Sequence, residues 1–201
     1  MKQLDIFSWF FDYCKKLSSD PSCEIRTIDN PGFFVSVNLK KCELINKQFT
    51  PTTIERSEHD WVHCFIRNEK FEGYCGPINL LELLLLFKNW VTYDVAVDFN
   101  DNNLQWLMCW YAKHCDGSWE HNYGIQANLL ADGNCYLNID LTDTECENDS
   151  LEFQISEKQA CFHIQDKKFF SICDPLNLSD RLHDFRKLTE EHQEKSTSFL
   201  N

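Results

Sequence analysis

The densest group of side chains that could do chemistry lies in residues 115–125, CDGSWEHNYGI. Asp116, Glu120 and His121 are the residue types of a general acid/base set or of a metal site. We favour a structural interpretation, in which Asp116 begins a turn, Trp119 is an anchor, and Glu120 or His121 is a strand side chain. We therefore expect no catalytic residue, no metal and no cofactor.

A second polar segment, RSEHDWVHC, covers residues 56–64. His59 and His63 are four residues apart, which suits zinc only on a helix, and this stretch looks like a loop entering a strand. Cys75 has no basic neighbour that would stabilise a thiolate, so we expect a buried structural thiol. Only six glycines are present, and there is no phosphate-binding loop, nucleophile–base motif or basic-aromatic patch. These absences favour a protein-binding molecule.

An internal repeat organises the elements around these segments. Residues 70–87, KFEGYCGPINLLELLLLF, recur as residues 168–185, KFFSICDPLNLSDRLHDF, with eight identities in eighteen positions and no gap. Residues 30–39 match residues 132–141 by their apolar alternation. Two copies of one module therefore account for most of the chain.

Each copy is expected to hold a helix, an antiparallel meander and a second helix packed on the sheet, which is an α+β fold. In copy one, residues 1–95, we expect a helix over 3–17, strands over 23–28 and 33–39, a polar loop over 40–53, strands over 61–67 and 70–74, and a helix over 80–91 capped by Asn79. In copy two, residues 103–195, we expect a helix over 103–114, strands over 123–130, 135–141, 151–155, 160–165 and 168–172, and a final helix capped by Asn177.

The helix expected over Leu80–Val91 begins LLELLLLF and is apolar nearly all round. A helix without a polar face is usually buried on more than one side. We therefore expect it to lie between the two copies or in a homodimer contact.

Charge and cysteine content restrict the partners and the compartment. The net charge is −13, of which residues 1–95 carry −2 and residues 96–201 carry −11. Such an acidic field repels nucleic acid and anionic membranes and speeds encounter with a basic partner. The alternative is that the acidic residues serve only the solubility of the protein. The eleven cysteines are odd in number, without a C-x-x-C pair, and no signal peptide is recognisable. We expect a cytoplasmic protein with free thiols and with no nucleic-acid or membrane partner.

The chain resembles the immunity protein 53 family of bacterial polymorphic toxin systems. The opening motif of that family resembles LQWL at 104–107, Trp110-Tyr111 and CDGSWEHNYGI; its closing motif resembles RSEHDW at 56–61 and KFEGYCGPINLLELLLLFKNWV at 70–91. The resemblance implies an α+β immunity protein that binds a cognate toxin and occludes its effector domain. Copy one has lost the opening motif, and copy two has lost the closing motif.

We expect the toxin to be contacted by residues of both motifs and approached through an acidic run. The candidate residues are Asp116, Trp119, Glu120, His121, Arg56 and Glu58, with Asp140, Asp143, Glu145, Glu147, Asp149 and Glu152 as the steering run. Trp61 and Trp110 are expected in the core. Two explanations remain for the lost motifs. Either one composite binding surface combines the two surviving motifs, or each copy lost half of the family pattern because a single binding surface is enough. The alternative functions are a hydrolase that reverses a toxin modification and an acidic interaction module.

Overall fold

The structure is a computed structural model that describes residues 5–92, 101–148 and 162–198. The helices are α1 (Ile6–Leu17), α2 (Leu80–Thr92), α3 (Asn102–His114), α4 (Trp119–Asn122) and α5 (Leu178–Ser198), with 3₁₀ turns η1 (Glu43–Asn46) and η2 (Pro175–Asn177). The strands are β1 (Cys23–Ile28), β2 (Gly32–Asn38), β3 (Thr52–Ser57), β4 (Asp60–Arg67), β5 (Lys70–Cys75), β6 (Ile125–Leu129), β7 (Cys135–Asp140), β8 (Phe162–Gln165) and β9 (Lys168–Cys173). The expected α+β class is confirmed.

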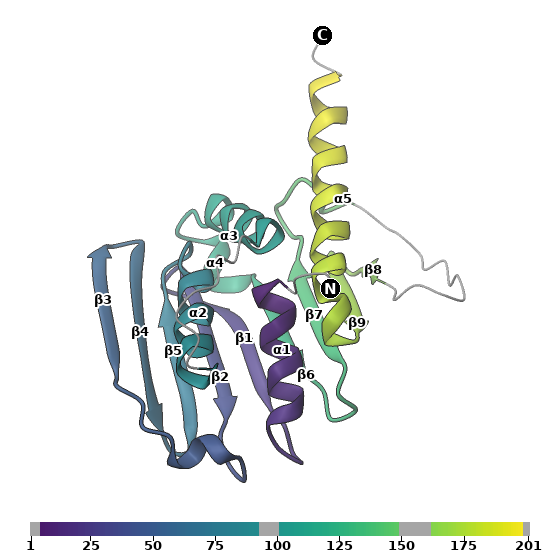
Figure 1. Cartoon of the computed structure of the whole chain (residues 1–201). Helices are drawn as coiled ribbons and strands as arrows, with labels where there is room; N and C mark the ends of the chain where they lie inside the picture. Colours follow the sequence, from purple (N-terminus) through teal and green to yellow (C-terminus); the bar gives the residue numbers. More distant parts are fainter. Residues whose placement is uncertain (1–4, 93–100, 149–161, 199–201) are drawn as a thin grey trace.

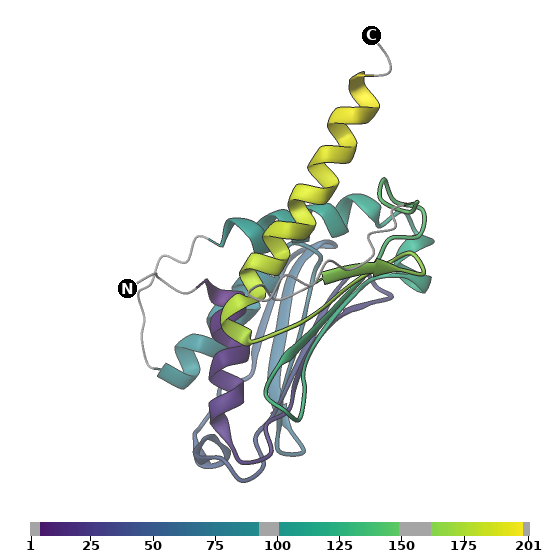
Figure 2. The same cartoon turned by 90° about the vertical axis from the view of Figure 1, so that its right-hand side faces the viewer.

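All of these strands join one antiparallel sheet that runs through both copies. The order is β3-β4-β5-β2-β1-β6-β7-β9-β8. The two copies therefore meet edge to edge where β1 pairs with β6. Helices α1, α2, α3 and α5 lie on one side of this sheet, and the opposite side carries no described helix (Figures 1 and 2).

An approximate twofold axis relates the two copies at this junction. The repeat aligns residues 30–39 with 132–141, an offset that makes Ile25 the equivalent of Ala127. These two residues are direct partners across β1 and β6, and the neighbouring pairs Glu24↔Asn128 and Arg26↔Gln126 exchange under the same offset. The duplicated strand thus pairs with its own copy about its midpoint, as two subunits of a dimer would.

One hydrophobic core extends under both copies. Phe87 and its repeat equivalent Phe185 are both fully buried. The Phe87 ring contacts Phe10 and Phe71, at centroid distances of 5.5 and 4.9 Å. The Phe185 ring contacts Trp110 at 5.0 Å. Because the buried residues form a single contiguous cluster, the two copies share one core, although each brings its own aromatic centre.

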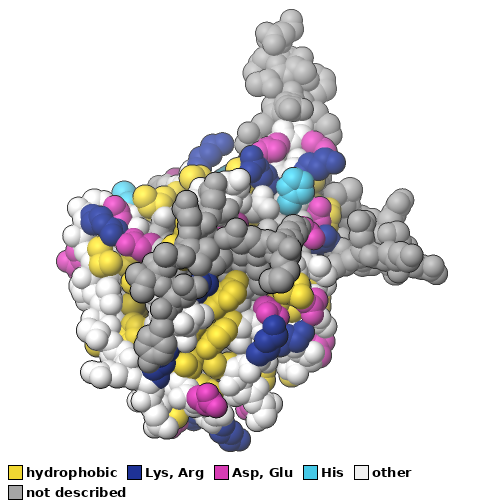
Figure 3. Space-filling model, viewed as in Figure 1, with side chains coloured by type: hydrophobic (Ala, Val, Ile, Leu, Met, Phe, Trp, Pro, Cys, Tyr) yellow, Lys and Arg dark blue, Asp and Glu magenta, His cyan; other side chains and the backbone are white. Residues whose placement is uncertain are grey.

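Alternation along the strands separates the helix side of the sheet from its open face. On β2, Val35 and Val37 are fully buried beneath the helices, whereas Ser36 between them is half-buried and faces the other way. The same alternation places Trp61, His63 and Phe65 of β4 on the open face. On the helix side, basic and acidic side chains are interspersed around hydrophobic ones (Figure 3). The open face is the side of the sheet that the described helices leave uncovered (Figures 1 and 2).

Three sequence-based expectations about local structure were wrong. The polar loop was expected to include residues 52 and 53, but Thr52–Ser57 forms the edge strand β3, which pairs with β4. Asn79 precedes α2, yet its side-chain oxygen accepts a hydrogen bond from the backbone N–H of Trp61. Asn177 lies inside η2, where the side chain of Asp174 provides the cap. The strand expected over 151–155 lies outside the described residues.

Helix α2 lies between elements of both copies, as its apolar sequence predicts. It packs on α1, β4 and β5 of copy one and on α3 of copy two. Leu83 and Leu84 are fully buried, while Leu81, Leu85 and Leu86 are half-buried against the same core. A homodimer contact through this helix stays a prediction.

The described cysteines are free thiols, most of them buried. Burial raises the pKa of Cys75 above its ordinary value, and it raises the pKa of Cys173 to about 11. Both thiols are therefore protonated near neutral pH, which agrees with the expected structural role. Within the described ranges, no helix is both long and apolar enough to cross a membrane.

Asp101 joins the first helices of the two copies through a buried carboxylate. It is 3% exposed and accepts hydrogen bonds from the backbone N–H groups of Leu104 (2.9 Å) and Phe7 (3.3 Å). Burial, with the nearby Asp5 carboxylate, raises the pKa of Asp101 to about 6. The folded-state pKa therefore exceeds the ordinary value of about 3.9.

This raised pKa predicts a specific pH dependence of stability. The stabilisation from protonating Asp101 is fully present below about pH 4 and is lost as the pH rises through about 6. When the pH falls from 7.5 to 5, the free energy of unfolding of the wild type should rise by about 1 kcal/mol relative to that of Asp101→Asn, which cannot titrate at position 101. Urea unfolding of both proteins at the two pH values measures this difference, and equal pH dependence of the two would contradict it.

Candidate protein-binding surface

The opening motif of copy two is held together by the Glu120 side chain. This carboxylate is 5% exposed and accepts hydrogen bonds from the backbone N–H groups of Asp116 (3.1 Å) and Gly117 (3.0 Å). Gly117 has φ +89°, a conformation that favours glycine. Glu120 and His121 were expected on a strand, but both lie in α4, because this local network closes a short helical turn.

Asp116 and Trp119 fix the same turn from its other side. The exposed Asp116 carboxylate accepts from the backbone N–H groups of Trp119 (3.0 Å) and Ser118 (2.9 Å), which lower the pKa of Asp116. Trp119, a predicted contact residue, is only 4% exposed, and its indole N–H donates to the Thr142 carbonyl at 2.7 Å. Trp119 therefore anchors the motif in the core beside Trp110, which is buried as expected.

Replacing Glu120 is expected to damage the fold. Glu120→Ala removes the buried carboxylate that accepts hydrogen bonds from the backbone N–H groups of Asp116 and Gly117. Unfolding should become easier by about 1.5–3 kcal/mol, the usual contribution of a hydrogen bond to a charged group. Chemical denaturation measures this change, with the exposed His121→Ala as the matched control. A Glu120→Ala protein as stable as the wild type would contradict the structural role.

The closing motif of copy one is held by a charged network around Arg56. Its guanidinium binds both oxygens of Glu82, at 2.9 and 2.7 Å, and one oxygen of Asp60 at 2.9 Å. The amide of Asn79 donates to Asp60 at 2.8 Å. Hydrogen bonds from Asn79 and Arg56 lower the pKa of Asp60, and the Arg56 hydrogen bond lowers the pKa of Glu82. The network fastens β3 and β4 to the start of α2.

Both motifs lie at the same end of the sheet, on either side of the turn between β1 and β2. Strand pairing places Val62, Cys75 and Phe33 in one row across β4, β5 and β2. On the other side, Gly124 lies so close to Thr27 that a Cβ there would meet the threonine Oγ1 at 1.9 Å. Tyr111 of α3 accepts a hydrogen bond from the Gly32 N–H at 3.3 Å, so copy two also holds the turn of copy one.

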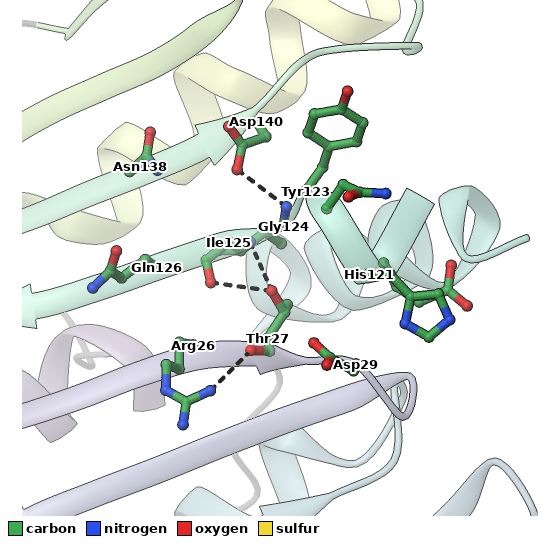
Figure 4. Close-up of a pocket in the computed structure, with 12 residues that line it drawn as sticks. Arg26, Thr27, Asp29, His121, Tyr123, Gly124, Ile125, Gln126, Asn138 and Asp140 are labelled. Atoms are coloured by element: carbon green, nitrogen blue, oxygen red, sulfur yellow. Dashed lines mark hydrogen bonds between the residues drawn. The ribbon is translucent and has the colours of Figure 1, made fainter. Parts of the chain in front are cut away.

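A hollow of about 250 Å³ opens beside this turn, over the pairing of β1 with β6. We call it the seam hollow, because both copies line it (Figure 4). Copy one provides Arg26, Thr27 and Asp29, and copy two provides residues 120–126, Asn138 and Asp140. Predicted contact residues Glu120, His121 and Asp140 therefore lie on this hollow.

A larger hollow of about 670 Å³ lies on the other side of the turn. We call it the aromatic hollow; its lining residues are Asn30, Glu55, Arg56, Ser57, Glu58, Trp61, His63 and Tyr74. Predicted contacts Arg56 and Glu58 line it. Trp61 was expected in the core, but it is half-buried on the open face, because Val62 and Cys64 take the inward positions of β4.

The acidic run is largely engaged in local contacts. Asp140 pairs with Lys168 (3.2 Å), Glu145 with His114 (3.0 Å), and Glu147 with Lys167. Asp143 is exposed. Asp149 and Glu152 lie outside the described residues. The pairings of Asp140 and Glu147 with lysines reduce the local negative charge that is available to steer a partner. The steering role stays a prediction.

The carboxylates of the opening motif are occupied by backbone N–H groups instead of facing one another as an acid/base pair. Among the described residues, no group of three or more His, Cys, Asp or Glu side chains is arranged to hold a metal ion. The arrangement instead offers two adjoining hollows with aromatic and carboxylate linings, which suits recognition of a protein surface.

Sequence reasoning missed Asp29, Asn138, Tyr74 and His63 as residues of this surface. Period-two alternation over β4, WVHCF, gave a signal for His63, since it places His63 beside Trp61 on one face. Asp29 and Asn138 belong to different copies and line the same hollow only because β1 pairs with β6, for which the sequence carries no local signal.

Comparison with known proteins agrees with this architecture. Searches of curated proteins and of solved structures found no match. The family model of immunity protein 53 matches the chain twice, over residues 4–92 and 104–190. These two segments coincide with the two halves that the twofold axis relates in the sheet. The chain belongs to the immunity protein 53 family, with two copies of the family module in tandem.

Proposed function

We propose that this protein neutralises a cognate toxin by binding its effector domain with the open face of the sheet, at the end where the two hollows lie. The observation that carries the proposal is the placement of the surviving motifs. Copy two keeps the opening motif and copy one keeps the closing motif, and the fold sets both beside the turn between β1 and β2. A composite surface explains why each copy needs only half of the pattern.

The chemistry of this surface supports recognition by a few anchors. Trp61 and Tyr74 present aromatic area next to His63, and Arg56 and Glu58 form a charged margin. Aromatic residues with a polar rim are typical of the energetic centre of protein interfaces. Because helices brace the sheet from behind, the surface is held rigid before the toxin arrives, which lowers the entropic cost of binding.

Stoichiometry separates occlusion from enzymatic reversal of a toxin modification. The chain and the toxin domain encoded beside its gene are purified separately and mixed in increasing ratios while toxin activity is followed. Occlusion predicts complete inhibition at one chain per toxin, together with co-purification of the complex and survival of co-expressing cells. Protection by substoichiometric chain without a stable complex would overturn occlusion in favour of an enzyme.

A further inference from the structure

We propose, building on the toxin-binding function above, that the toxin adds an extended segment to the outer edge of β3 as one more strand of the sheet. Strand β3 begins the strand order and pairs with β4 on one side. No described element lies along its other side (Figure 1). An edge strand offers a row of unpaired backbone N–H and C=O groups, and an extended peptide is the ligand that matches such a row.

Hydrogen bonding of β4 shows which of its backbone groups reach β3. The Trp61 carbonyl accepts a hydrogen bond from the Gly76 N–H at 2.9 Å. Because Gly76 directly follows β5, the backbone groups of Trp61 point toward β5. Backbone groups of successive strand residues point to alternate sides. Val62 and Cys64 therefore direct their N–H and C=O groups toward β3.

Two residues of β3 consequently have backbone groups that point outward. The direct partners of those two β4 residues are Ile54 and Thr52, whose backbone groups therefore point toward β4. Thr53 and Glu55 alternate with them, so their N–H and C=O groups point away from the sheet. These groups are the hydrogen-bonding sites that an added strand uses.

The middle of this edge lacks the usual protection against strand addition. Proline, lysine and bulges protect the edges of natural sheets. Pro51 precedes β3 and a register shift lies near its end, but residues 52–55, TTIE, contain neither proline nor lysine. The guanidinium of Arg56 binds Glu82 at 2.9 and 2.7 Å, so it is turned toward α2. The open stretch is long enough, because three registered residue pairs join β1 to β6.

The size of the sheet favours a toxin segment over a second copy of this chain. The described residues already form a sheet of nine strands, and twisted open sheets rarely exceed about ten strands. One added strand fits this limit. Edge-to-edge pairing of two chains through β3 would double the sheet and exceed it.

The side chains of this edge continue the candidate surface. Glu55 lines the aromatic hollow, and its side chain is 69% exposed although its carboxylate lies 3.0 Å from the His63 ring nitrogen. Ile54 is half-buried and points inward. Opposite charges that face each other across two strands are stabilising. The matching toxin segment therefore carries a basic residue beside Glu55 and an apolar residue beside Ile54.

The first test follows backbone amide hydrogen exchange of the whole chain by NMR, with and without the toxin domain encoded beside its gene. The amides of Thr53 and Glu55 should exchange rapidly in the free chain. In the complex they should exchange at least about tenfold more slowly, because each gains a hydrogen-bond acceptor. The amides of Thr52 and Ile54 should be protected in both states.

Two results of this exchange experiment would overturn the proposal. Rapid exchange at Thr53 and Glu55 in the saturated complex would exclude strand addition at β3. Protection of both amides in the free chain that grows with protein concentration would identify a second copy, instead of the toxin, as the occupant of the edge.

The second test measures the toxin affinity of two variants by calorimetry. Thr53→Pro removes the outward N–H, and proline is tolerated on an edge strand where the N–H faces solvent. Its affinity should fall by about tenfold or more. Thr53→Val is the matched control, because it keeps the N–H and the branched Cβ and loses only the hydroxyl, so its affinity should be unchanged. Equal affinities of the two variants would overturn a backbone contact at β3.

The outcomes distinguish strand addition from the proposed function. If the wild type does not bind the toxin, the proposed function fails and strand addition fails with it. If the wild type and Thr53→Pro bind equally, toxin binding stands and strand addition is overturned. Urea unfolding checks that Thr53→Pro is folded, and if it is not, amide exchange of the wild type decides.

Discussion

Phe185→Ala is expected to destabilise the whole chain by about 3–5 kcal/mol, which is the usual cost of removing a fully buried phenylalanine. The Phe185 ring lies against Trp110, Trp106 and Phe169 at centroid distances of 5.0, 5.7 and 5.2 Å, so the cavity cannot close without moving several rings. Because one sheet and one core run through both copies, Phe87→Ala in copy one should produce a loss of similar size. Differential scanning calorimetry should show a single transition for each variant.

The same experiment tests whether the two copies behave as one cooperative unit. Leu176→Ala is the control, because that side chain is 52% exposed and should cost less than about 0.5 kcal/mol. Two separate transitions, of which Phe185→Ala shifts only one, would contradict the shared core. They would show that the two copies unfold as independent domains.

Trp61→Ala is expected to weaken toxin binding by roughly 30-fold or more, because central aromatic anchors often contribute 2 kcal/mol or more to affinity. The Trp61 ring is half-buried on the open face, packs 5.3 Å from the His63 ring and lines the aromatic hollow. Its removal leaves Val62 and Cys64, the inward side chains of β4, in place. The loss should therefore appear in affinity and only weakly in stability.

Trp106→Ala is the matched control for this substitution. Trp106 is also a half-buried tryptophan, but it lies on the helix side against Phe185. Its removal should leave toxin affinity unchanged and reduce stability instead. If Trp106→Ala weakens binding and Trp61→Ala does not, the toxin binds the helix side.

Local patterns predicted much of the fold. Alternation located β1 and β2, and the hairpin around Asn68-Glu69 is confirmed, with both residues at positive φ. The helical spacing of apolar residues was also sufficient to predict α1 and α3. In these segments, side-chain pattern and turn chemistry agree with the final structure, so little depends on distant contacts.

The remaining features depend on interactions that the local sequence does not encode. Strand β3 has a single inward apolar residue, Ile54, and is defined by pairing with β4. Helix α4 exists because Glu120 reaches back to the N–H groups of residues 116 and 117. The duplication predicted two modules, but the merging of their sheets rests on contacts between residues about 100 positions apart, such as Ile25 with Ala127. The candidate surface lies at this junction, so it could be predicted only in part.

Hydroxyl-radical footprinting of the complex tests most directly whether the toxin covers the open face. The chain is labelled alone and with the toxin domain encoded beside its gene, and side-chain oxidation is read by mass spectrometry. Oxidation of Trp61, Tyr74 and Tyr123 should fall in the complex, while oxidation of Trp106 should be unchanged. Protection of Trp106 with full reactivity at Trp61 and Tyr74 would contradict binding of the toxin to the open face.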